Sequence, residues 1–339
     1  MPVRCKVCVC LSSAVCGQSR TLKDPLLVSA MSDDRIDYND ENRNLIINKG
    51  STKELTVTNC IFQQTQGCIY ANPSGSATIA RNIFYKSHQN GVVDIRSSSM
   101  LTFCANCILH CIGQGAGADG DTYGSLTLLQ SDEIVGYSLN LAFGNNDADK
   151  SHWIEYVFAN KADIATSNHT RNTAKSCSGI LVKSVNRGSS RMLWMEECKS
   201  SLRYEIFQSF EGFSVSKLIF SRGDSFSSDS CDFRLYNSRN VEVYECIFYQ
   251  NKQNNDFLFY DIDSITFSGC KFSRSSVVIG GDETKVNAKF SGNVLSLQEI
   301  PNLDIYVPAK CSARKTIASN CYLKNVIQIS LVINTNCCV

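Results

Sequence analysis

An eight-residue pattern that returns about every 23 residues constrains this chain more than any other feature of its sequence. Each copy begins with an apolar residue and alternates between apolar and polar positions. It then ends with Cys or Asn, one further residue, and Phe or Leu. A fixed period in this range is the signature of repeats that stack on one another. Clear copies occupy 55–62, 77–84, 102–109, 241–248, 265–272 and 288–295, and weaker ones 193–198 and 218–225.

The sixth position of each copy measures the period. We interpret the one long step, from Cys107 to Cys198, as four steps of about 23 residues, with candidate strands at 125–129, 153–158 and 179–185. The array is then continuous from residue 45 to residue 300. The sixth positions are Cys60, Asn82, Cys107, Cys198, Gly223, Cys246, Cys270 and Asn293, separated by 22, 25, 91, 25, 23, 24 and 23 residues.

The alternation within each copy has a period of two residues, which is typical of β-strands. A second apolar run lies between successive copies, for example at 67–70, 91–95 and 256–262. The intervals contain no long amphipathic helix, and a propeller blade needs about 40 residues or more. The sequence therefore predicts an all-β fold, a single-stranded right-handed parallel β-helix (a solenoid) of about 10–11 coils of ~23 residues.

Stacked coils place equivalent residues roughly 4.8 Å apart, so each position forms a column along the rod. We expect an inward apolar column at the eighth position of the pattern, because a single coil cannot bury its own apolar face. The expected members are Phe62, Phe84, Leu109, Phe248, Phe272 and Leu295.

The 18 cysteines are predicted to be mostly buried thiols and not a disulfide framework. Neighbours in one column point the same way, which is poor geometry for a disulfide. Asn in the same column is expected to bond to the next coil as an amide ladder. The column members are Cys60, Cys107, Cys198, Cys246 and Cys270, with Asn82 and Asn293. A spacing that admits a metal site occurs near the N-terminus, at Cys5, Cys8, Cys10 and Cys16. The spacing of Cys337 and Cys338 does not decide between lipidation and simple exposure.

The composition bears on which partners the chain binds and on whether it crosses a membrane. The 33 basic and 32 acidic residues leave a net charge of +1, which argues against nucleic acid as a partner. No apolar stretch reaches the ~18 residues of a transmembrane helix. We predict three parts: an N-terminal segment and cap over 1–44 with a weakly signal-like start, the β-helix over 45–300, and a C-terminal cap or tail over 301–339.

Three short motifs carry a resemblance to a known group. Asn-Cys-Ile-Phe at 59–62, Gly-Cys-Ile-Tyr at 67–70 and Gly-Val-Val-Asp-Ile at 91–95 resemble the polymorphic outer-membrane-protein-like repeats of bacterial and parasitic-protist surface proteins. The resemblance implies a pectin-lyase-like right-handed β-helix. It also implies display at a cell surface or secretion, and adhesion to a host or cell-surface protein or glycan.

The alternative of a carbohydrate-active enzyme requires carboxylates that converge on a sugar or on Ca²⁺. The repeats lack the Asn-Thr-Asp, Asp-Asp, Gly-His-Gly and Arg-Ile-Lys motifs of pectate lyases and polygalacturonases. Weak Ca²⁺ candidates are Asp119, Asp121, Asp147 and Asp149, whereas Asp261 and Asp263 are interpreted as a solvated strand face. The four histidines, His88, His110, His152 and His169, lack metal-ligand spacing, although His88 and His110 lie one coil apart.

We therefore expect a non-enzymatic binding protein with no catalytic residue and no cofactor. An intracellular, cytoplasmic scaffold and a carbohydrate-active enzyme remain as alternatives. An enzyme requires a groove with converging carboxylates, an adhesin requires an exposed aromatic or polar face, and an intracellular scaffold requires reduced cysteines.

Overall fold

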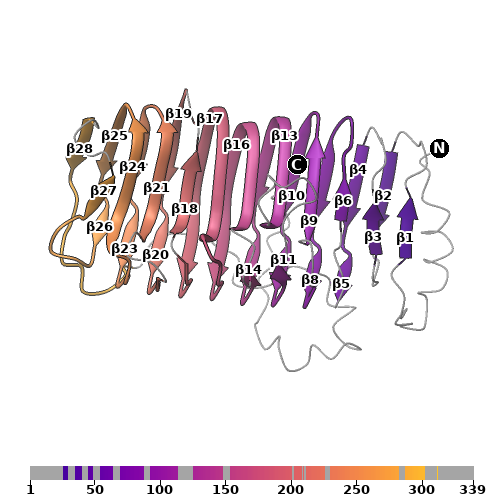
Figure 1. The fold of residues 1–339 in the computed structure, drawn as a ribbon, viewed down its shortest axis with the longest axis horizontal. Coiled ribbons are helices and arrows are strands. Elements are labelled where there is room, and N and C mark those ends of the chain that lie inside the picture. Colours follow the sequence, from indigo (N-terminus) through magenta and orange to yellow (C-terminus); the bar gives the residue numbers. More distant parts are fainter. Residues whose placement is uncertain are drawn as a thin grey trace.

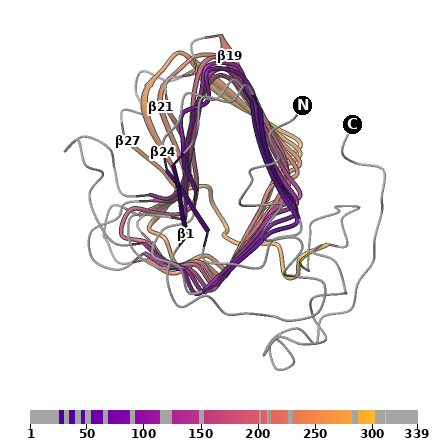
Figure 2. The same cartoon turned by 90° about the vertical axis from the view of Figure 1, so that its right-hand side faces the viewer.

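The chain winds into a rod of stacked coils (Figure 1), in which every pair of neighbouring strands is parallel. Seen along the rod, the coils superimpose around one central core (Figure 2). The predicted all-β, right-handed parallel β-helix is confirmed. The computed structural model describes residues 26–29, 35–39, 45–48, 54–63, 69–87, 92–113, 125–147, 153–200, 202–207, 209, 211–225, 230–281, 287–301 and 311.

The strands form three ladders that run along the rod. The first ladder contains β1 (Leu26–Ser29), β3 (Leu45–Asn48), β6 (Ile69–Ala71), β9 (Val93–Ser97), β18 (Leu202–Phe207), β21 (Cys231–Ser238), β24 (Asn255–Ile262) and β27 (Ile279–Gly281). The second contains β2 (Arg35–Asn39), β4 (Glu54–Thr58), β7 (Ala77–Ala80), β10 (Met100–Cys104), β19 (Gly212–Ser216), β22 (Val241–Tyr244), β25 (Ser264–Ser268) and β28 (Asn287–Ser291). The third contains β5 (Ile61–Gln63), β8 (Ile83–Tyr85), β11 (Cys107–Leu109), β14 (Leu141–Phe143), β20 (Ile219–Ser221), β23 (Ile247–Tyr249) and β26 (Lys271–Phe272).

Three long strands connect these ladders in the middle of the rod. They bend around the coil, so β13 (Ser125–Ser138) joins the first two ladders, whereas β16 (Trp153–Thr170) and β17 (Cys177–Glu196) take part in all three. The candidate strands at 125–129, 153–158 and 179–185 fall within these three strands and are confirmed. A separate two-stranded sheet pairs β12 (Ile112–Gly113) with β15 (Asn146–Asp147).

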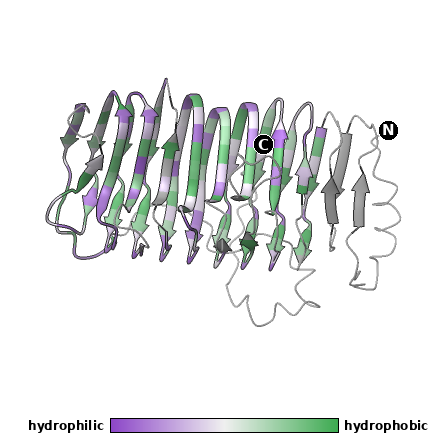
Figure 3. Ribbon diagram, viewed as in Figure 1, coloured by the Kyte–Doolittle hydropathy of each residue, from purple (hydrophilic) through white to green (hydrophobic). Residues whose placement is uncertain are grey.

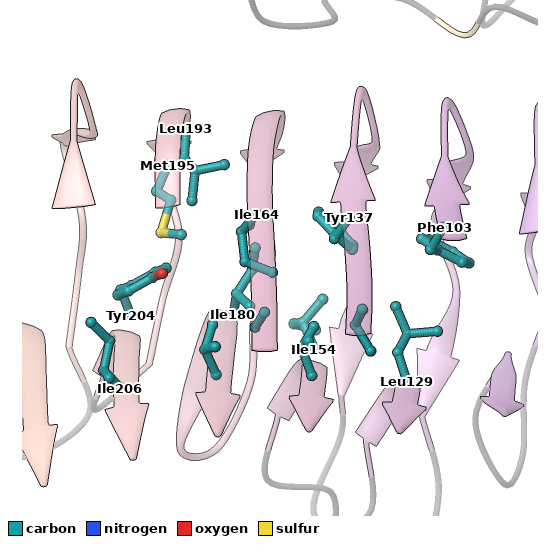
Figure 4. Close-up of a cluster of buried hydrophobic side chains, with 14 of the residues drawn as sticks. Phe103, Leu129, Tyr137, Ile154, Ile164, Ile180, Leu193, Met195, Tyr204 and Ile206 are labelled. Atoms are coloured by element: carbon teal, nitrogen blue, oxygen red, sulfur yellow. The ribbon is translucent and has the colours of Figure 1, made fainter. Parts of the chain in front are cut away.

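Side chains at equivalent positions stack in rows inside the rod. Figure 4 shows such a row in the second ladder, where Phe103, Tyr137 and Ile164 come from successive coils. Hydrophobic and hydrophilic residues are interleaved along the strands (Figure 3), because alternate side chains face the core and the solvent. The core is therefore continuous along the rod and is not divided among coils.

The predicted apolar column is largely confirmed in the third ladder. The rings of Phe62 and Phe84 stack at 4.9 Å, and those of Phe248 and Phe272 also stack at 4.9 Å. Leu109 was assigned to this column wrongly, because Phe84 pairs with Ile108. Leu109 instead lies beside Tyr85 on the outer side of the ladder.

Two corners flank the third ladder in each coil. The inward residue at the first corner is Cys, Ser or Asn in most coils and Leu in two of them. At the first corner the backbone N–H of Cys60 donates to Asn82 Oδ1 at 2.9 Å. Asn82 Nδ2 donates to Val57 O at 2.9 Å and to Asn106 Oδ1 at 3.1 Å. The predicted amide ladder between coils is thus confirmed. The first-corner column is Cys60, Asn82, Asn106, Asn140, Ser167, Leu193, Leu218, Cys246, Cys270 and Asn293.

The second corner lies five residues later and carries a similar column. Cys111 N donates to Asn145 Oδ1 at 2.9 Å, and Asn145 N donates to Asn172 Oδ1 at 3.1 Å. Cys198 follows Asn172 in this column, so its assignment to the first corner was wrong. Cys107 was also assigned wrongly, because Asn106 occupies the first corner.

These two corrections change the number of coils in the middle of the chain. The first-corner residues are Asn106, Asn140, Ser167 and Leu193, which gives steps of 34, 27 and 26 residues. The interval therefore holds three long coils, and the interpretation of 91 residues as four coils of about 23 was wrong. Coil length varies because residues inserted between paired strands do not disturb the ladders themselves.

The residue before each corner column adopts a left-handed backbone conformation, usually without being glycine. Asn59 has a φ of 55°, Arg81 of 59° and Ala105 of 55°. This conformation costs a residue with a side chain about 1–2 kcal/mol. The hydrogen bonds that follow at Cys60, Asn82 and the next coils offset that cost, since they satisfy buried backbone groups.

Candidate functional site

A column of aromatic side chains lies on the outer side of the first ladder, in the middle and C-terminal coils. The register aligns Phe158 of β16, Lys183 of β17, Phe207 of β18, Tyr236 of β21 and Tyr260 of β24. We call Phe158, Lys183, Tyr236 and Tyr260 the outer aromatic column. All four side chains are half-buried, so part of each faces solvent.

Contacts along the outer aromatic column hold the side chains in place. Lys183 Nζ lies 4.8 Å from the ring centroid of Phe158, which is within the range of a cation–π contact. The rings of Tyr236 and Tyr260 lie 6.1 Å apart with an interplanar angle of 46°. The column therefore combines aromatic faces, a cation and tyrosine hydroxyls on one rigid ladder.

A small hydrophobic cluster on the same ladder packs next to the outer aromatic column. Trp153, which is 8% exposed, stacks on Tyr156 with 5.6 Å between the ring centroids. Leu181, Leu258 and the partly buried Tyr260 belong to the same cluster. Sequence reasoning missed this face, because only the register between β16 and β24 shows that these residues share one column.

A second unusual group lies inside the rod. Tyr137, Glu155 and His169 project into the core from β13 and from the two ends of β16, and all three are fully buried. His169 Nε2 lies 3.9 Å from Glu155 Oε2, and the His169 ring stacks on Tyr137 at 6.5 Å. The Tyr137 hydroxyl, both Glu155 oxygens and both His169 nitrogens lack a hydrogen bond within the described chain.

Burial sets the charge state of this internal group. It raises the pKa of Glu155 to about 8, against a smaller opposing effect of the Tyr137 hydroxyl, and it lowers the pKa of His169 to about 3. Between these values Glu155 is protonated and His169 is neutral. The contact at 3.9 Å is then between two neutral side chains and not an ion pair. Periodicity could not identify this group, because the neighbouring coils place Thr127 and Ile180 at the level of Glu155, and Ala142 and Met195 at the level of His169, none of which titrates.

The described part of the structure does not bring the predicted Ca²⁺ ligands together at one site. Asp119, Asp121 and Asp149 lie outside them. Asp147 lies in β15, where its backbone position pairs with Gly113. Within the described part of the chain, no group of three or more His, Cys, Asp or Glu side chains has an arrangement that fits a metal ion. The N-terminal cysteines 5, 8, 10 and 16 and the pair 337–338 also lie outside it.

The other acidic and histidine candidates that the structure describes take part in surface ion pairs or in packing between rings. Asp261 and Asp263 are exposed, and Asp263 contacts Arg239 of the preceding coil at 3.3 Å. His110 packs edge-on against Tyr85 and Phe143. The register puts Lys86 at the level of His110. Residues 88 and 152 are outside the described ranges.

The cysteines divide into two groups. Cys107 faces outward and forms a disulfide with Cys311, with 5.6 Å between the Cα atoms. Burial raises the pKa of the Cys246 thiol well above its ordinary value, which makes it unreactive. The other described cysteines are buried thiols, as predicted for most of them: Cys60, Cys104, Cys111, Cys177, Cys198, Cys231, Cys246 and Cys270.

Alkylation followed by peptide mass spectrometry without reduction is expected to separate these groups. In the native protein the eight buried thiols stay unlabelled, because the alkylating reagent does not reach a buried thiol. In denaturant all eight become labelled, whereas the peptides of Cys107 and Cys311 are recovered together. Disulfides among the eight, or their rapid labelling in the native state, would contradict the column interpretation.

Comparison of the chain with protein-family models, curated proteins and solved structures finds no match. The described residues include no helix with the length and hydropathy needed to cross a membrane.

Proposed function

We propose that this protein is a non-enzymatic β-helix protein, displayed at a cell surface or secreted, that adheres to glycans through the outer aromatic column. The observation that carries the proposal is the alignment of Phe158, Lys183, Tyr236 and Tyr260 on one outer face of the rod. A row of partly exposed rings on a rigid ladder is a recognition surface, since tyrosine and other aromatic residues supply large contact areas at low entropic cost.

The chemistry of the column fits a sugar chain. The faces of Phe158, Tyr236 and Tyr260 suit the C–H surfaces of pyranose rings, and Lys183 and the tyrosine hydroxyls suit sugar hydroxyls. The column repeats along the rod at about 4.8 Å per coil, so an extended chain lying along it meets the same chemistry several times. The likeness of residues 59–62, 67–70 and 91–95 to polymorphic outer-membrane-protein-like repeats supports the same function.

Cysteine chemistry separates this proposal from that of an intracellular scaffold. The Cys107–Cys311 disulfide is typical of an oxidising compartment and favours secretion or surface display. The eight buried thiols favour the scaffold as second candidate. We give the disulfide more weight, because burial alone accounts for the survival of thiols inside a packed core.

Binding to an array of neutral and acidic oligosaccharides tests the proposal. We expect the wild-type chain to bind at least one class of glycan, and Tyr236→Ala combined with Tyr260→Ala to weaken that binding at least about tenfold, since each exposed aromatic contact contributes about 1 kcal/mol. The matched control is Tyr244→Ala, a tyrosine of the neighbouring ladder that is 36% exposed. No glycan binding by the wild type, or equal binding by all variants, would overturn the proposal.

A further inference from the structure

The internal group of Tyr137, Glu155 and His169 has a fourth polar neighbour. Thr127 of β13 pairs in register with Glu155 and is also fully buried. Its hydroxyl, like the Tyr137 hydroxyl, both Glu155 oxygens and both His169 nitrogens, has no hydrogen-bond partner among the described residues. Four side chains from adjacent coils thus bring unpaired donors and acceptors to one stretch of the core.

Such a concentration of unpaired polar atoms is costly inside a folded protein. A buried polar group that lacks a hydrogen bond loses more free energy than an ordinary hydrogen bond contributes, and the net stability of a domain is small. Elsewhere in this core polar side chains are paired: the Tyr204 hydroxyl bonds to the Ser190 hydroxyl, and the Ser178 and Ser200 hydroxyls lie 2.6 Å apart. The group around Glu155 therefore requires a partner that the neighbouring side chains do not supply.

The residues beside this group are small. Ala142 is the neighbour of His169 in the preceding coil, at a position of the third ladder where large side chains stand in the other described coils. The other members of this inward row, apart from His169, are Phe62, Phe84, Ile108, Met195, Phe220, Phe248 and Phe272. The rings of Tyr137 and His169 also lie 6.5 Å apart, against 5.7 Å for Phe103 and Tyr137. A partner of the size of water, about 30 Å³, suits this place.

The chemistry of the group selects a neutral partner that both donates and accepts hydrogen bonds. Burial raises the pKa of Glu155 to about 8 and lowers that of His169 to about 3, so neither side chain is charged between these values. A protonated carboxyl, a neutral imidazole and a hydroxyl each offer a donor and an acceptor. A metal ion binds lone pairs only, and zinc takes three or four protein ligands, a set that the described residues do not form here.

We propose that the core of the rod binds at least one ordered water molecule between Glu155 and His169, with the hydroxyls of Tyr137 and Thr127 as further partners. Two hydrogen bonds of about 2.8 Å that meet at the water oxygen at about 90° span the 3.9 Å between Glu155 Oε2 and His169 Nε2. A buried water typically makes about three hydrogen bonds, which this group supplies. The inference does not depend on the proposed glycan function.

A high-resolution crystal structure of the full-length wild-type chain tests the proposal directly. We expect a solvent peak within about 2.6–3.2 Å of both Glu155 Oε2 and His169 Nε2. A direct hydrogen bond between Glu155 and His169 with no solvent peak beside them would overturn the proposal. So would a peak with anomalous scattering and ligand distances of about 2.0–2.2 Å, which identifies a metal ion.

Oxygen-17 magnetic relaxation dispersion tests it in solution, because this measurement counts water molecules that stay inside a protein. Ala142→Leu fills the space beside His169 and is expected to remove the contribution of at least one such water. The matched control is Ala165→Leu, at a half-buried outward position of β16, which is expected to keep the wild-type dispersion. Circular dichroism checks that both variants retain the β-helix. An unchanged dispersion in folded Ala142→Leu would contradict the proposal, and if this variant does not fold, the wild-type crystal structure decides.

Discussion

Glu155 and His169 together are expected to make the β-helix most stable between about pH 4.5 and pH 6.5. The folded state raises the pKa of Glu155 from 4.5 to about 8, so this group favours folding below pH 4.5 and that contribution is lost as pH rises to about 8. It lowers the pKa of His169 from 6.5 to about 3, so this group disfavours folding as pH falls below 6.5. Between pH 4.5 and pH 6.5 the fall in stability due to Glu155 and the rise due to His169 cancel as pH increases.

Above pH 6.5 only the titration of Glu155 still changes the stability with pH. Each unit of pKa shift corresponds to about 1.4 kcal/mol, so the free energy of unfolding falls by about 2 kcal/mol between pH 6.5 and pH 8. Glu155→Gln removes the ionisation and keeps the size of the side chain. The difference in stability between this variant and the wild type is expected to grow by about 1.4 kcal/mol per pH unit across the range from 4.5 to 8.

Equilibrium urea unfolding of both proteins at several pH values measures this difference. Subtracting the two profiles cancels the titration of every other group that the variants share. The control is Glu242→Gln, which changes an exposed glutamate of β22 and leaves the wild-type profile in place. A difference between wild type and Glu155→Gln that does not vary with pH would show that Glu155 is ionised in the folded state and contradict its burial as a neutral acid.

Asn106→Ala is expected to lower the free energy of unfolding on the order of 3–6 kcal/mol, because it leaves several buried polar groups without partners. Asn106 Oδ1 accepts hydrogen bonds from the backbone N–H of Asn82 at 3.0 Å and from Asn82 Nδ2 at 3.1 Å. Asn106 Nδ2 donates to Ile79 O at 2.8 Å. These groups lie inside the rod, where water does not replace the lost partner.

Urea unfolding followed by circular dichroism measures the effect. Thr102→Ala is the matched control, since it removes polar atoms from an outward position of the same coil and is expected to change stability by less than about 0.5 kcal/mol. Asn106→Asp separates the two functions of the amide, because it keeps the acceptor for Asn82 and removes the donor to Ile79. A loss of stability in Asn106→Ala no larger than that in Thr102→Ala would contradict the amide ladder as a support of the corners.

The repeat could be predicted wherever one short motif marks one coil. Phe62 and Phe84 stack as the period predicts, and so do Phe248 and Phe272. A column of identical residues at a regular spacing has few arrangements other than a stack of coils. The prediction of mostly buried thiols followed from the same periodicity, because Cys246 and Cys270 share one column with Asn293.

The register in the middle of the chain could not be predicted. Asn106 and Cys107 are adjacent and both fit the motif, so a pattern of residue types does not decide which of them faces inward. Cys198 fits the motif equally well, but it belongs to the second corner. Each coil has two corners with the same chemistry, and a one-residue slip moves every side chain to the other face.

The sequence by itself determined the architecture, since alternating strands at a period near 23 residues bury their apolar faces only by stacking. Only the tertiary structure decided which residues share a column, because hydrogen bonds between coils set the register and coil lengths vary from 22 to 34 residues. The outer aromatic column and the internal pair of Glu155 and His169 both depend on that register. They bring together residues that are far apart in the chain, and local periodicity carries no information about such contacts.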